Sequence, residues 1–467
     1  MKKVLCFLSA LIILLTAFTA FVGAELYRES DNVTFRLIDE WGNREYLSGV
    51  TTESEYYLKG HLNWAVEFSP YENEVNTEYS FRKIVKSETG TYSYGFATPG
   101  FDLFDMKNEN ERLKADIDAL KSEAVNAGDI RTLSVKMADY FEYYPVNLNL
   151  TLPGMSVSWQ SAMGYDDAGR YSFSGITSAR GSGFIRALNE YFKIPVIEED
   201  VRYVKIHVHD TGSYTYQCSM KNSFDFTVFD AVFSDTVYFT FRNEFDADDD
   251  VRLLCDTSQI PGGYGIYALP YSKGEIGYEA LETVYSIPAD STVKGLWSNE
   301  ERNELYLTLY ENDRYVLHVI DVRTMTDISV VDVFSFSYGD YAGGYQYDDF
   351  FVFIKNETEF SIVKREADGT YSSGFGGVMP AEYVADRDYF SYCSTFAFDG
   401  ERLAVFVIEE PFREELRILS IQPDIMVFTE DGIQYYGKWG CSLGAGAKDV
   451  INYDAVWRKT GYSVKFS

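Results

Sequence analysis

Histidine, cysteine and proline are all scarce in this chain of 467 residues, which contains 4 His, 5 Cys and 11 Pro. No Cys-x-x-Cys pair occurs, and this absence excludes zinc ribbons and thioredoxin-like motifs. No proline-rich or serine-rich linker occurs after residue 24, and the acidic, aromatic-rich composition continues to the end of the sequence. We therefore expect one large folded domain over residues 25–467 rather than a string of small ones.

Basic residues are also few. The chain has 41 Lys and Arg but 72 Asp and Glu, which gives a formal net charge of −31. A chain with this balance does not neutralise phosphates, which excludes nucleic acid and anionic lipid as partners. Intrinsic disorder is excluded as well, since 46% of the residues are hydrophobic and 17% are aromatic. The sequence describes a folded, acidic, aromatic-rich protein.

Motifs that identify a reaction are also missing. The chain contains no G-x-S-x-G elbow, no H-E-x-x-H, no phosphate-binding loop and no G-x-G-x-x-G fingerprint. The sequence accordingly predicts no catalytic residue, no cofactor-binding residue and no metal ligand. Glycoside hydrolysis stays open, because it needs only two well-placed carboxylates, and 72 acids cannot be sorted by sequence.

The first 24 residues have the three parts of a secretory signal peptide. Basic Lys2 and Lys3 precede an apolar run over residues 4–22, and small Gly23 and Ala24 follow it. Cleavage after Ala24 removes two lysines and no acid, so the formal net charge changes from −31 to about −33. We expect a secreted, extracellular protein with no membrane contact after cleavage. A retained membrane anchor is the alternative interpretation, since the run approaches the ~20 residues that span a bilayer.

Four cysteines remain after residue 24, and export permits disulfides between them. They allow three pairings, of which we favour the two between neighbours in the sequence, Cys218 with Cys255 and Cys393 with Cys441. Four buried thiols are the alternative.

Strand-like runs joined by turn signals recur along the second half of the chain. Residues 305–310 and 314–320 read as a β-hairpin, with Glu311, Asn312 and Asp313 as its turn. The same pattern predicts three further hairpins: residues 350–355 with 359–363, 403–408 with 416–421, and 237–241 with 251–254. First strands at residues 305, 350 and 403 lie 45 and then 53 residues apart. β-Propeller blades repeat at ~40–50 residues.

These intervals predict an all-β fold, a β-propeller of seven or eight blades. A radial arrangement of sheets limits exposed edges, and Tyr and Phe fill the gaps between sheets. One or more β-sandwiches are the alternative. A helical insertion is expected at about residues 106–127, where Leu113, Ile117, Leu120 and Ala124 form one apolar stripe. We expect this helix to pack on the rim or outer face of the β-structure.

With its signal peptide, its repeated hairpins from about Val237 to Gln434 and its Gly-Asp turns, the chain resembles the uncharacterised β-propeller-like proteins exported by bacteria. The resemblance covers about half of the chain, at the level of architecture. It contains no residue-specific motif, so it implies a fold and no functional residue.

Two motifs have features of metal sites. His207 and His209 form a His-x-His on a predicted strand, where alternation points both rings to one face. Zinc needs three or four ligands, and we interpret the pair as surface histidines. The run Asp246–Asp250 opens like a calcium loop, but Val251 and Ser258 stand where an EF-hand has Gly and Glu. An acidic turn is the interpretation, and a structural calcium ion is the alternative.

We expect an exported, monomeric binding or scaffold protein without catalytic activity, whose partner is a protein or a glycan. The loops at residues 338–347 and 374–380 are the predicted binding segments. The alternative is a carbohydrate-binding or glycoside-hydrolysing protein that uses carboxylates and aromatic side chains at the propeller face. Its stacking candidates are the six tryptophans: Trp41, Trp64, Trp159, Trp297, Trp439 and Trp457.

Overall fold

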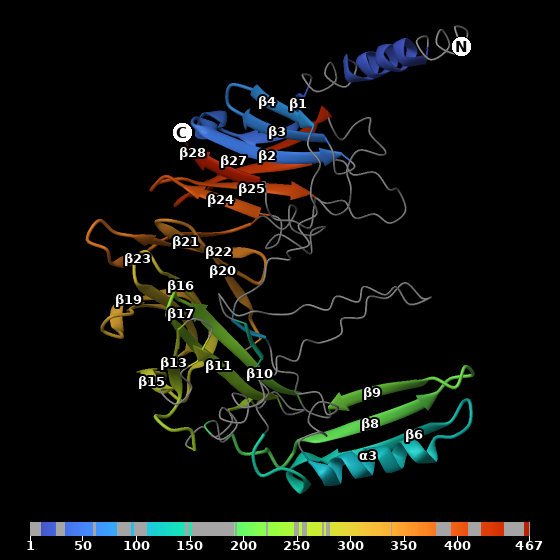
Figure 1. Ribbon diagram of the computed structural model, residues 1–467. Helices are drawn as coiled ribbons and strands as arrows, with labels where there is room; N and C mark the ends of the chain where they lie inside the picture. The colour runs from blue at the N-terminus through green and yellow to red at the C-terminus, as the bar shows by residue number, and fades with distance from the viewer. Residues whose placement is uncertain are drawn as a thin grey trace. The chain divides into compact units, whose positions relative to one another are not determined.

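The computed structural model consists mainly of β-strands, which form several antiparallel sheets with few helices (Figure 1). The all-β class predicted from the sequence is confirmed at this level. The structure describes residues 11–24, 33–58, 62–81, 95–97, 110–144, 149–151, 191, 194–220, 223–246, 252–254, 259–272, 275–276, 281–337, 339–379, 394–409, 422–442 and 462–466.

The chain divides into two compact units. Unit 1 consists of residues 1–88 and 339–467, and unit 2 consists of residues 89–338. Unit 1 is therefore assembled from the two ends of the sequence, with unit 2 as one continuous stretch between them. The prediction of one domain over residues 25–467 stays a prediction.

The first sheet of unit 1 is a four-stranded meander in chain order. Its strands are β20 (Ala342–Gln346), β21 (Phe350–Lys355), β22 (Glu359–Arg365) and β23 (Tyr371–Val378). The predicted hairpin of residues 350–363 is confirmed as β21 and β22. Asn356 and Glu357 form its turn with φ angles of 49° and 61°, in the left-handed region that two-residue and three-residue hairpin loops require.

The second sheet of unit 1 has the order β1-β27-β26-β25-β24, so its first strand comes from the other end of the chain. The strands are β24 (Ser394–Phe398), β25 (Leu403–Glu409), β26 (Gln422–Thr429), β27 (Gly432–Cys441) and β1 (Phe35–Gly42). The predicted strand at 403–408 is β25, and its predicted partner at 416–421 lies outside the described residues.

The third sheet of unit 1 also joins both ends of the sequence, in the order β28-β2-β3-β4. Its strands are β2 (Val50–Leu58), β3 (Leu62–Ser69), β4 (Glu74–Phe81) and β28 (Tyr462–Phe466). A short 3-10 helix, η1 (Arg44–Leu47), connects β1 to β2. Lys465 Nζ on β28 lies 2.6 Å from Glu53 Oε1 on β2, which ties the added strand to its neighbour.

In unit 2, one sheet is again a four-stranded meander, β16-β17-β18-β19. The strands are β16 (Thr292–Asn299), β17 (Glu304–Glu311), β18 (Arg314–Asp321) and β19 (Thr326–Ser335). The predicted hairpin of residues 305–320 is confirmed, and Asn312 and Asp313 form its turn with φ angles of 49° and 59°.

A second sheet of unit 2 has the order β10-β11-β13-β14, with β12 paired to β11 and β15 paired to β13. Strands lie where residues 237–241 and 252–254 predict them, but β12 pairs with Glu244–Asp246 of β11, beyond the predicted first strand, and Val237–Phe239 pair with β13 instead. The strands are β10 (Ser223–Val232), β11 (Thr236–Asp246), β12 (Arg252–Leu254), β13 (Gly265–Ser272), β14 (Glu275–Ile276) and β15 (Glu282–Ser286).

The third sheet of unit 2 is three-stranded and carries a helix on one face. It consists of β6 (Ile130–Lys136), β8 (Val201–Val208) and β9 (Tyr214–Met220), and the helix is α3 (Glu111–Glu123). Figure 1 shows α3 running alongside β6 and β8. Two shorter elements lie nearby in the sequence, the 3-10 helix η3 (Met137–Asp139) and the strand pair β5 (Gly95–Ala97) and β7 (Asn149–Thr151).

The helix α3 confirms the predicted stripe, with bounds that differ from the expected 106–127. Asn110 caps its N-terminus by accepting a hydrogen bond from the Leu113 amide at 2.9 Å. Leu113, Ile117 and Leu120 are buried, and burial of each stabilises the fold by about 1.5–3 kcal/mol. Helical structure ends before Gly128, whose φ of 85° only glycine adopts easily. Residues 101–109 lie outside the described part of the chain.

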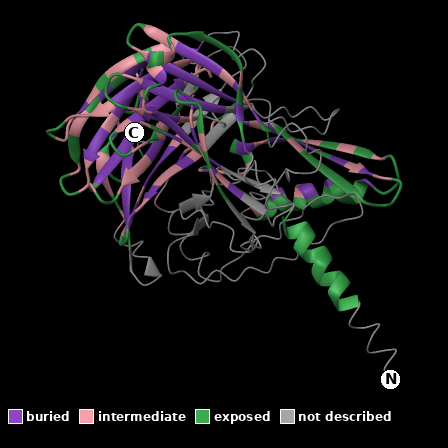
Figure 2. Cartoon of the chain, turned by 90° about the horizontal axis from the view of Figure 1, so that it is seen from above, coloured by how far each residue is buried: buried purple, intermediate pink, exposed green. Residues whose placement is uncertain are grey.

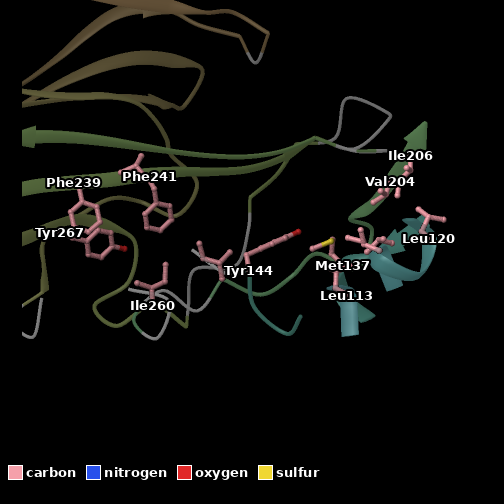
Figure 3. Close-up of a cluster of buried hydrophobic side chains, with 14 of the residues drawn as sticks. Leu113, Leu120, Met137, Tyr144, Val204, Ile206, Phe239, Phe241, Ile260 and Tyr267 are labelled. Carbon is pink, nitrogen blue, oxygen red and sulfur yellow. The ribbon is translucent and has the colours of Figure 1, made fainter. Parts of the chain in front are cut away.

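The hydrophobic core is divided into clusters that each lie between neighbouring layers of one unit. In unit 2, one cluster extends from α3 and β8 through Tyr144 and Ile260 to β11 and β13 (Figure 3). A second one fills the space between the β10–β15 sheet and the β16–β19 sheet. In unit 1, the β24–β27 sheet shares one cluster with β21 and β22 and another with β2 and β3. Successive sheets therefore pack face to face, and buried positions recur along their strands (Figure 2).

Candidate functional site

A cluster of polar side chains lies between two neighbouring sheets of unit 2. His318 is in the middle of β18, and its ring lies between two carboxylates. Asp327 Oδ1 on β19 is 3.3 Å from His318 Nδ1, and Glu311 Oε1 on β17 is 3.5 Å from His318 Nε2. From β15 of the other sheet, the Tyr285 hydroxyl donates to Asp327 Oδ1 at 3.0 Å and lies 3.2 Å from His318 Nδ1. We call these four residues the His318 cluster.

Protonation of His318 is governed by opposing effects. Burial disfavours the charged ring, since only 12% of the side chain is exposed, but hydrogen bonds and charge from Asp327 and Glu311 outweigh burial. The pKa of His318 is raised above its ordinary value as a result. Burial and the nearby Asp327 charge also raise the pKa of the Tyr285 hydroxyl. The cluster therefore favours a charged imidazole between two carboxylates, which links three strands of one sheet, and Tyr285 adds a fourth strand from the neighbouring sheet.

The predicted histidine pair lies elsewhere in unit 2, on the three-stranded sheet. The ring centroids of His207 and His209 are 4.6 Å apart, so both rings lie on one face, as alternation along the strand predicts. His209 Nε2 also hydrogen-bonds the hydroxyl of Thr215 on β9. Among the residues that the structure describes, no group of three or more His, Cys, Asp or Glu side chains could hold a metal ion.

The two faces of this sheet differ sharply. On β8, Val204, Ile206 and Val208 are buried and belong to the core cluster that contains α3. The alternate residues Tyr203, Lys205 and His207 point the opposite way. Their cross-strand partners share that face: Ser134, Thr132 and Ile130 on β6, and Ser219, Gln217 and Thr215 on β9.

We call these nine residues the open sheet face. Eight of them are exposed, and His207 is of intermediate exposure. Tyr203 keeps 42% of its surface exposed, and Ile130, at the end of β6, keeps 50%. The nine residues present five hydroxyl or amide side chains beside one tyrosine, one lysine and one histidine ring, and none of them is a carboxylate. Beyond them the same side of the sheet continues to Val201 and Lys136, where Lys136 Nζ lies 2.9 Å from Glu198 Oε1. Such a surface suits a polar ligand that offers many hydrogen-bonding groups.

A buried ion pair lies at the base of the sheet. Arg202, at the start of β8, donates from Nε and from an Nη to the two oxygens of Asp200, at 3.1 Å and 2.9 Å. Both side chains are 1% exposed or less. The Tyr144 hydroxyl donates to Asp200 Oδ2 at 2.8 Å. The bidentate contact is local, between residues two apart, and the Tyr144 hydroxyl connects it to the core.

Some of the tryptophans that the structure describes are buried in the core, and others are partly exposed to solvent. Trp64 and Trp439 are buried in the core cluster of β2, β3 and the β24–β27 sheet, and Trp297 is of intermediate exposure. Trp41 is 37% exposed and stacks with Tyr436 at a centroid distance of 6.4 Å. Trp159 and Trp457 lie outside the described residues.

The two predicted binding loops are largely strands instead. Residues 342–346 form β20 and residues 371–378 form β23, so the loop interpretation is wrong over half of 338–347 and most of 374–380. Their glycines serve close packing: a Cβ at Gly376 would lie 2.8 Å from Phe360 O, and one at Gly377 would lie 2.7 Å from Phe360 Cε1. A glycine-rich segment can therefore be a strand that packs against a bulky neighbour.

The calcium-loop and disulfide predictions stay untested. Asp246 ends β11, and residues 247–250 lie outside the described chain. Cys218 is on β9 in unit 2 and Cys441 is on β27 in unit 1, while Cys255 and Cys393 are not described. Both favoured pairings, Cys218 with Cys255 and Cys393 with Cys441, fall within a single unit.

Sequence reasoning missed the His318 cluster and the open sheet face. His318 stood alone in its strand, and its partners come from β15, β17 and β19, so no spacing in the sequence signals the cluster. A signal for the open face did exist in the alternation of residues 201–208, where apolar and polar side chains take turns.

Comparisons with known proteins do not assign a family. No protein-family model matches the chain, and no curated protein matches it. Among solved structures it is similar to the WD40 domain of SCAP from fission yeast, at 8% identity and a TM-score of 0.22, over 54% of this chain and 72% of that one.

Two further structures are similar at the same low level. One is a chain from a structural and mechanistic analysis of two prolyl endopeptidases. It is 7% identical to this chain, with a TM-score of 0.23, and the match covers 84% of this chain and 43% of that one. An oligogalacturonate lyase in complex with manganese gives 10% identity and a TM-score of 0.14, over 51% and 98%. At these TM-scores the likenesses carry no conclusion about this chain, and the assignment to the all-β class rests on its own sheets.

Proposed function

We propose that this chain is an exported binding or scaffold protein without catalytic activity, and that it binds its partner on the open sheet face. The observation that carries the proposal is the one-sided burial of the β6–β8–β9 sheet. One face is covered by α3 and forms core, whereas eight of the nine residues on the other face are exposed. A rigid sheet with one face left to solvent is a preorganised binding surface.

We propose that the larger sheets are blades of a β-propeller with seven or eight blades. The β16–β19 and β20–β23 sheets are four-stranded meanders in chain order, as blades are. Two sheets of unit 1 take a strand from the opposite end of the sequence, which is how a ring of blades is closed. The shared core clusters between successive sheets fit this arrangement.

Export is proposed from the first 24 residues. Residues 11–24 are helical and exposed along their whole length, and eight large apolar side chains there keep between 37% and 69% of their surface exposed (Figure 2). An apolar helix that stays exposed suits a segment that is removed. No helix among the described residues is both long enough and apolar enough to cross a membrane. Intact mass of the secreted protein tests this proposal, with a chain that begins at Glu25 as the expected result.

Steric blockage of the open face tests the site of binding. The mature chain is immobilised and screened against an array of glycans and proteins, and each ligand found is then tested on Thr132→Trp. Thr132 is exposed on the open face, and a bulky ring there is expected to weaken binding at least 10-fold. Ser122→Trp, on the exposed side of α3, is the control. A ligand that binds Thr132→Trp as tightly as the unmodified chain would contradict the proposal.

The His318 cluster favours a second candidate, a protein that hydrolyses glycosides. Glu311 and Asp327 are two carboxylates held close to one another by a shared imidazole, and glycosidases work with two carboxylates. Release of reducing sugar by the mature chain, abolished in both Glu311→Gln and Asp327→Asn, would establish this activity. Ligand binding without any release of sugar supports the non-catalytic proposal instead.

A further inference from the structure

We propose that the open sheet face binds an acidic polysaccharide, a polymer of sugar rings that carry carboxylates. The inference rests on the proposed function and names the chemical class of its ligand. The polymer lies along β8, with one ring against Tyr203 and a carboxylate beside Lys205.

Charge gives the first argument. The chain has 72 acidic residues and a formal net charge of −31, so most of its surface repels anions. The open sheet face is an exception, because its nine residues include no Asp or Glu, and the Glu198 carboxylate at its end is paired with Lys136. Lys205 is exposed at its centre, between Tyr203 and His207 on the same strand. An anionic ligand is therefore attracted to this face in preference to the surrounding surface.

Hydrogen-bonding chemistry gives the second argument. Lys205 is paired across the sheet with Thr132 on β6 and Gln217 on β9, and Tyr203 is paired with Ser134 and Ser219. The hydroxyl and amide side chains both donate and accept hydrogen bonds, as the hydroxyl groups of a sugar ring do, and the Lys205 ammonium donates. All of them are exposed, so each is available to a ligand without movement of the backbone.

The tyrosine gives the third argument. Tyr203 keeps 42% of its surface exposed, although the tyrosines that the structure buries in the core show that this chain readily packs such rings. An aromatic ring has a negative face, against which the polarised C–H groups of a sugar ring stack. Residues 203, 205 and 207 are spaced about 6.7 Å apart along β8, so the stacking ring, the cation and the imidazole form an extended row.

Other partners fit this face less well. A protein interface has an apolar, aromatic-rich centre, whereas the aliphatic side chains on this side of the sheet, Ile130 and Val201, lie at its two ends. Nucleic acids and anionic membranes are bound through several cations, whereas this side of the sheet has Lys205 and, at its end, Lys136, which is paired with Glu198. A polymer with a single carboxylate and several hydroxyls on each sugar matches the open sheet face, where Lys205 lies among five hydroxyl or amide side chains.

The face is held rigid from behind. Leu113, Ile117 and Leu120 of α3 pack in one core cluster with Val204 and Ile206 of β8, and the Asp200–Arg202 ion pair is buried at the start of β8. A surface that is already ordered loses little entropy when a ligand binds, so even a few hydrogen bonds contribute to affinity.

Affinity electrophoresis of the mature chain tests the inference. The gels contain polygalacturonate or alginate as acidic polymers and dextran as the neutral polymer. The unmodified chain is expected to be retarded by the acidic polymers and not by dextran, and retardation is expected to fall as salt is raised. Tyr203→Ala and Lys205→Gln are each expected to weaken binding at least 10-fold. Thermal melting confirms that both variants fold.

Matched variants elsewhere on the surface serve as controls. Tyr71 in unit 1 is 40% exposed, close to the 42% of Tyr203, and Lys114 is exposed on α3. Tyr71→Ala and Lys114→Gln are expected to bind the acidic polymers as the unmodified chain does.

The remaining outcomes separate this inference from the proposed function. Binding of acidic polymers that survives in both Tyr203→Ala and Lys205→Gln overturns the inference. Equal retardation by dextran, lost in Tyr203→Ala, shows that the ligand class is wrong while the binding face stands. Absence of retardation by every polymer also overturns the inference, and the proposed function then depends on the separate test with Thr132→Trp.

Discussion

His318 and Asp327 lie on adjacent strands of one sheet, with the imidazole Nδ1 3.3 Å from the carboxylate Oδ1. Tyr285 donates to the same carboxylate from the neighbouring sheet. A single carboxylate therefore accepts from both sheets at once, and the stability of this contact depends on the protonation of one ring.

The pKa of His318 gives the stability a pH dependence of known sign. This pKa is raised above the ordinary value of 6.5, so the folded chain binds the proton more tightly than the unfolded chain does. The stabilisation is complete below the unfolded pKa and is lost as pH rises through the folded pKa. The difference in melting temperature between the unmodified chain and His318→Gln is expected to be larger at pH 5.5 than at pH 8.5.

A proton NMR titration provides the control for this prediction. The chain has 4 histidines, so His318→Gln identifies the His318 resonance by its disappearance. Asp327→Asn removes a carboxylate that raises the pKa of His318, and a lower His318 pKa is expected in that variant. A difference in melting temperature that grows with pH would contradict the assignment.

Gly265 is expected to be intolerant of any side chain. It lies on β13 opposite β15, and a Cβ there would meet Tyr285 O at 2.2 Å and Thr283 Cγ2 at 2.7 Å. Gly265→Ala must push β15 away from β13, at a cost of about 1–3 kcal/mol in the free energy of unfolding. Gly343→Ala is the matched control, because nothing lies within 4 Å of a Cβ at that position in β20. Urea unfolding measures both, and equal stabilities would show that β15 yields easily.

The Asp200–Arg202 pair is expected to be costly to break from one side. Both side chains are at most 1% exposed, so removal of one partner leaves a buried charge uncompensated. Arg202→Met or Asp200→Asn alone is expected to lower the free energy of unfolding by about 3–5 kcal/mol. The double variant is expected to lose less than the sum of the two single losses, as measured in urea. Strict additivity would mean that the two side chains act independently.

Strand β28 is expected to matter through its backbone rather than through its charge. Lys465→Gln removes the contact with Glu53, but both side chains are about half exposed, and such a pair contributes about 0–1 kcal/mol. Deletion of residues 462–467 leaves β2 with an unpaired edge along residues 50–54. Light scattering is expected to detect aggregation of the deletion variant and not of Lys465→Gln. Aggregation of both would assign the effect to the ion pair.

Local pairing was predictable from the sequence because it depends on neighbours in the chain. The hairpins of β17 with β18 and of β21 with β22 combine apolar strands with turns at Asn312–Asp313 and Asn356–Glu357, and both signals lie within about 15 residues. The stripe of α3 was predictable for the same reason, since Leu113, Ile117 and Leu120 repeat at helical spacing.

Distant pairing was not predictable in this way. Nothing in the residues of β1 identifies β27 as its partner, because any edge strand offers the same backbone groups. The His318 cluster was hidden by the same limit, since its four residues come from four strands. Gly376 and Gly377 led to the wrong prediction of a loop where the chain forms β23, because glycine is common both in turns and at close contacts between strands.

The pairing of β1 with β27 has a consequence for synthesis on the ribosome. The hydrogen bond from Thr34 N to Ser442 Oγ joins residues 408 positions apart, and β2 is separated from its partner β28 by a similar length of sequence. At ~5–20 residues per second, translation leaves these N-terminal strands without their partners for roughly 20–80 s. Unit 2 has all of its residues long before that time ends, but two sheets of unit 1 cannot be completed until the last strands emerge. A nascent chain that is exported as proposed therefore reaches the translocation machinery while unit 1 is still unfinished.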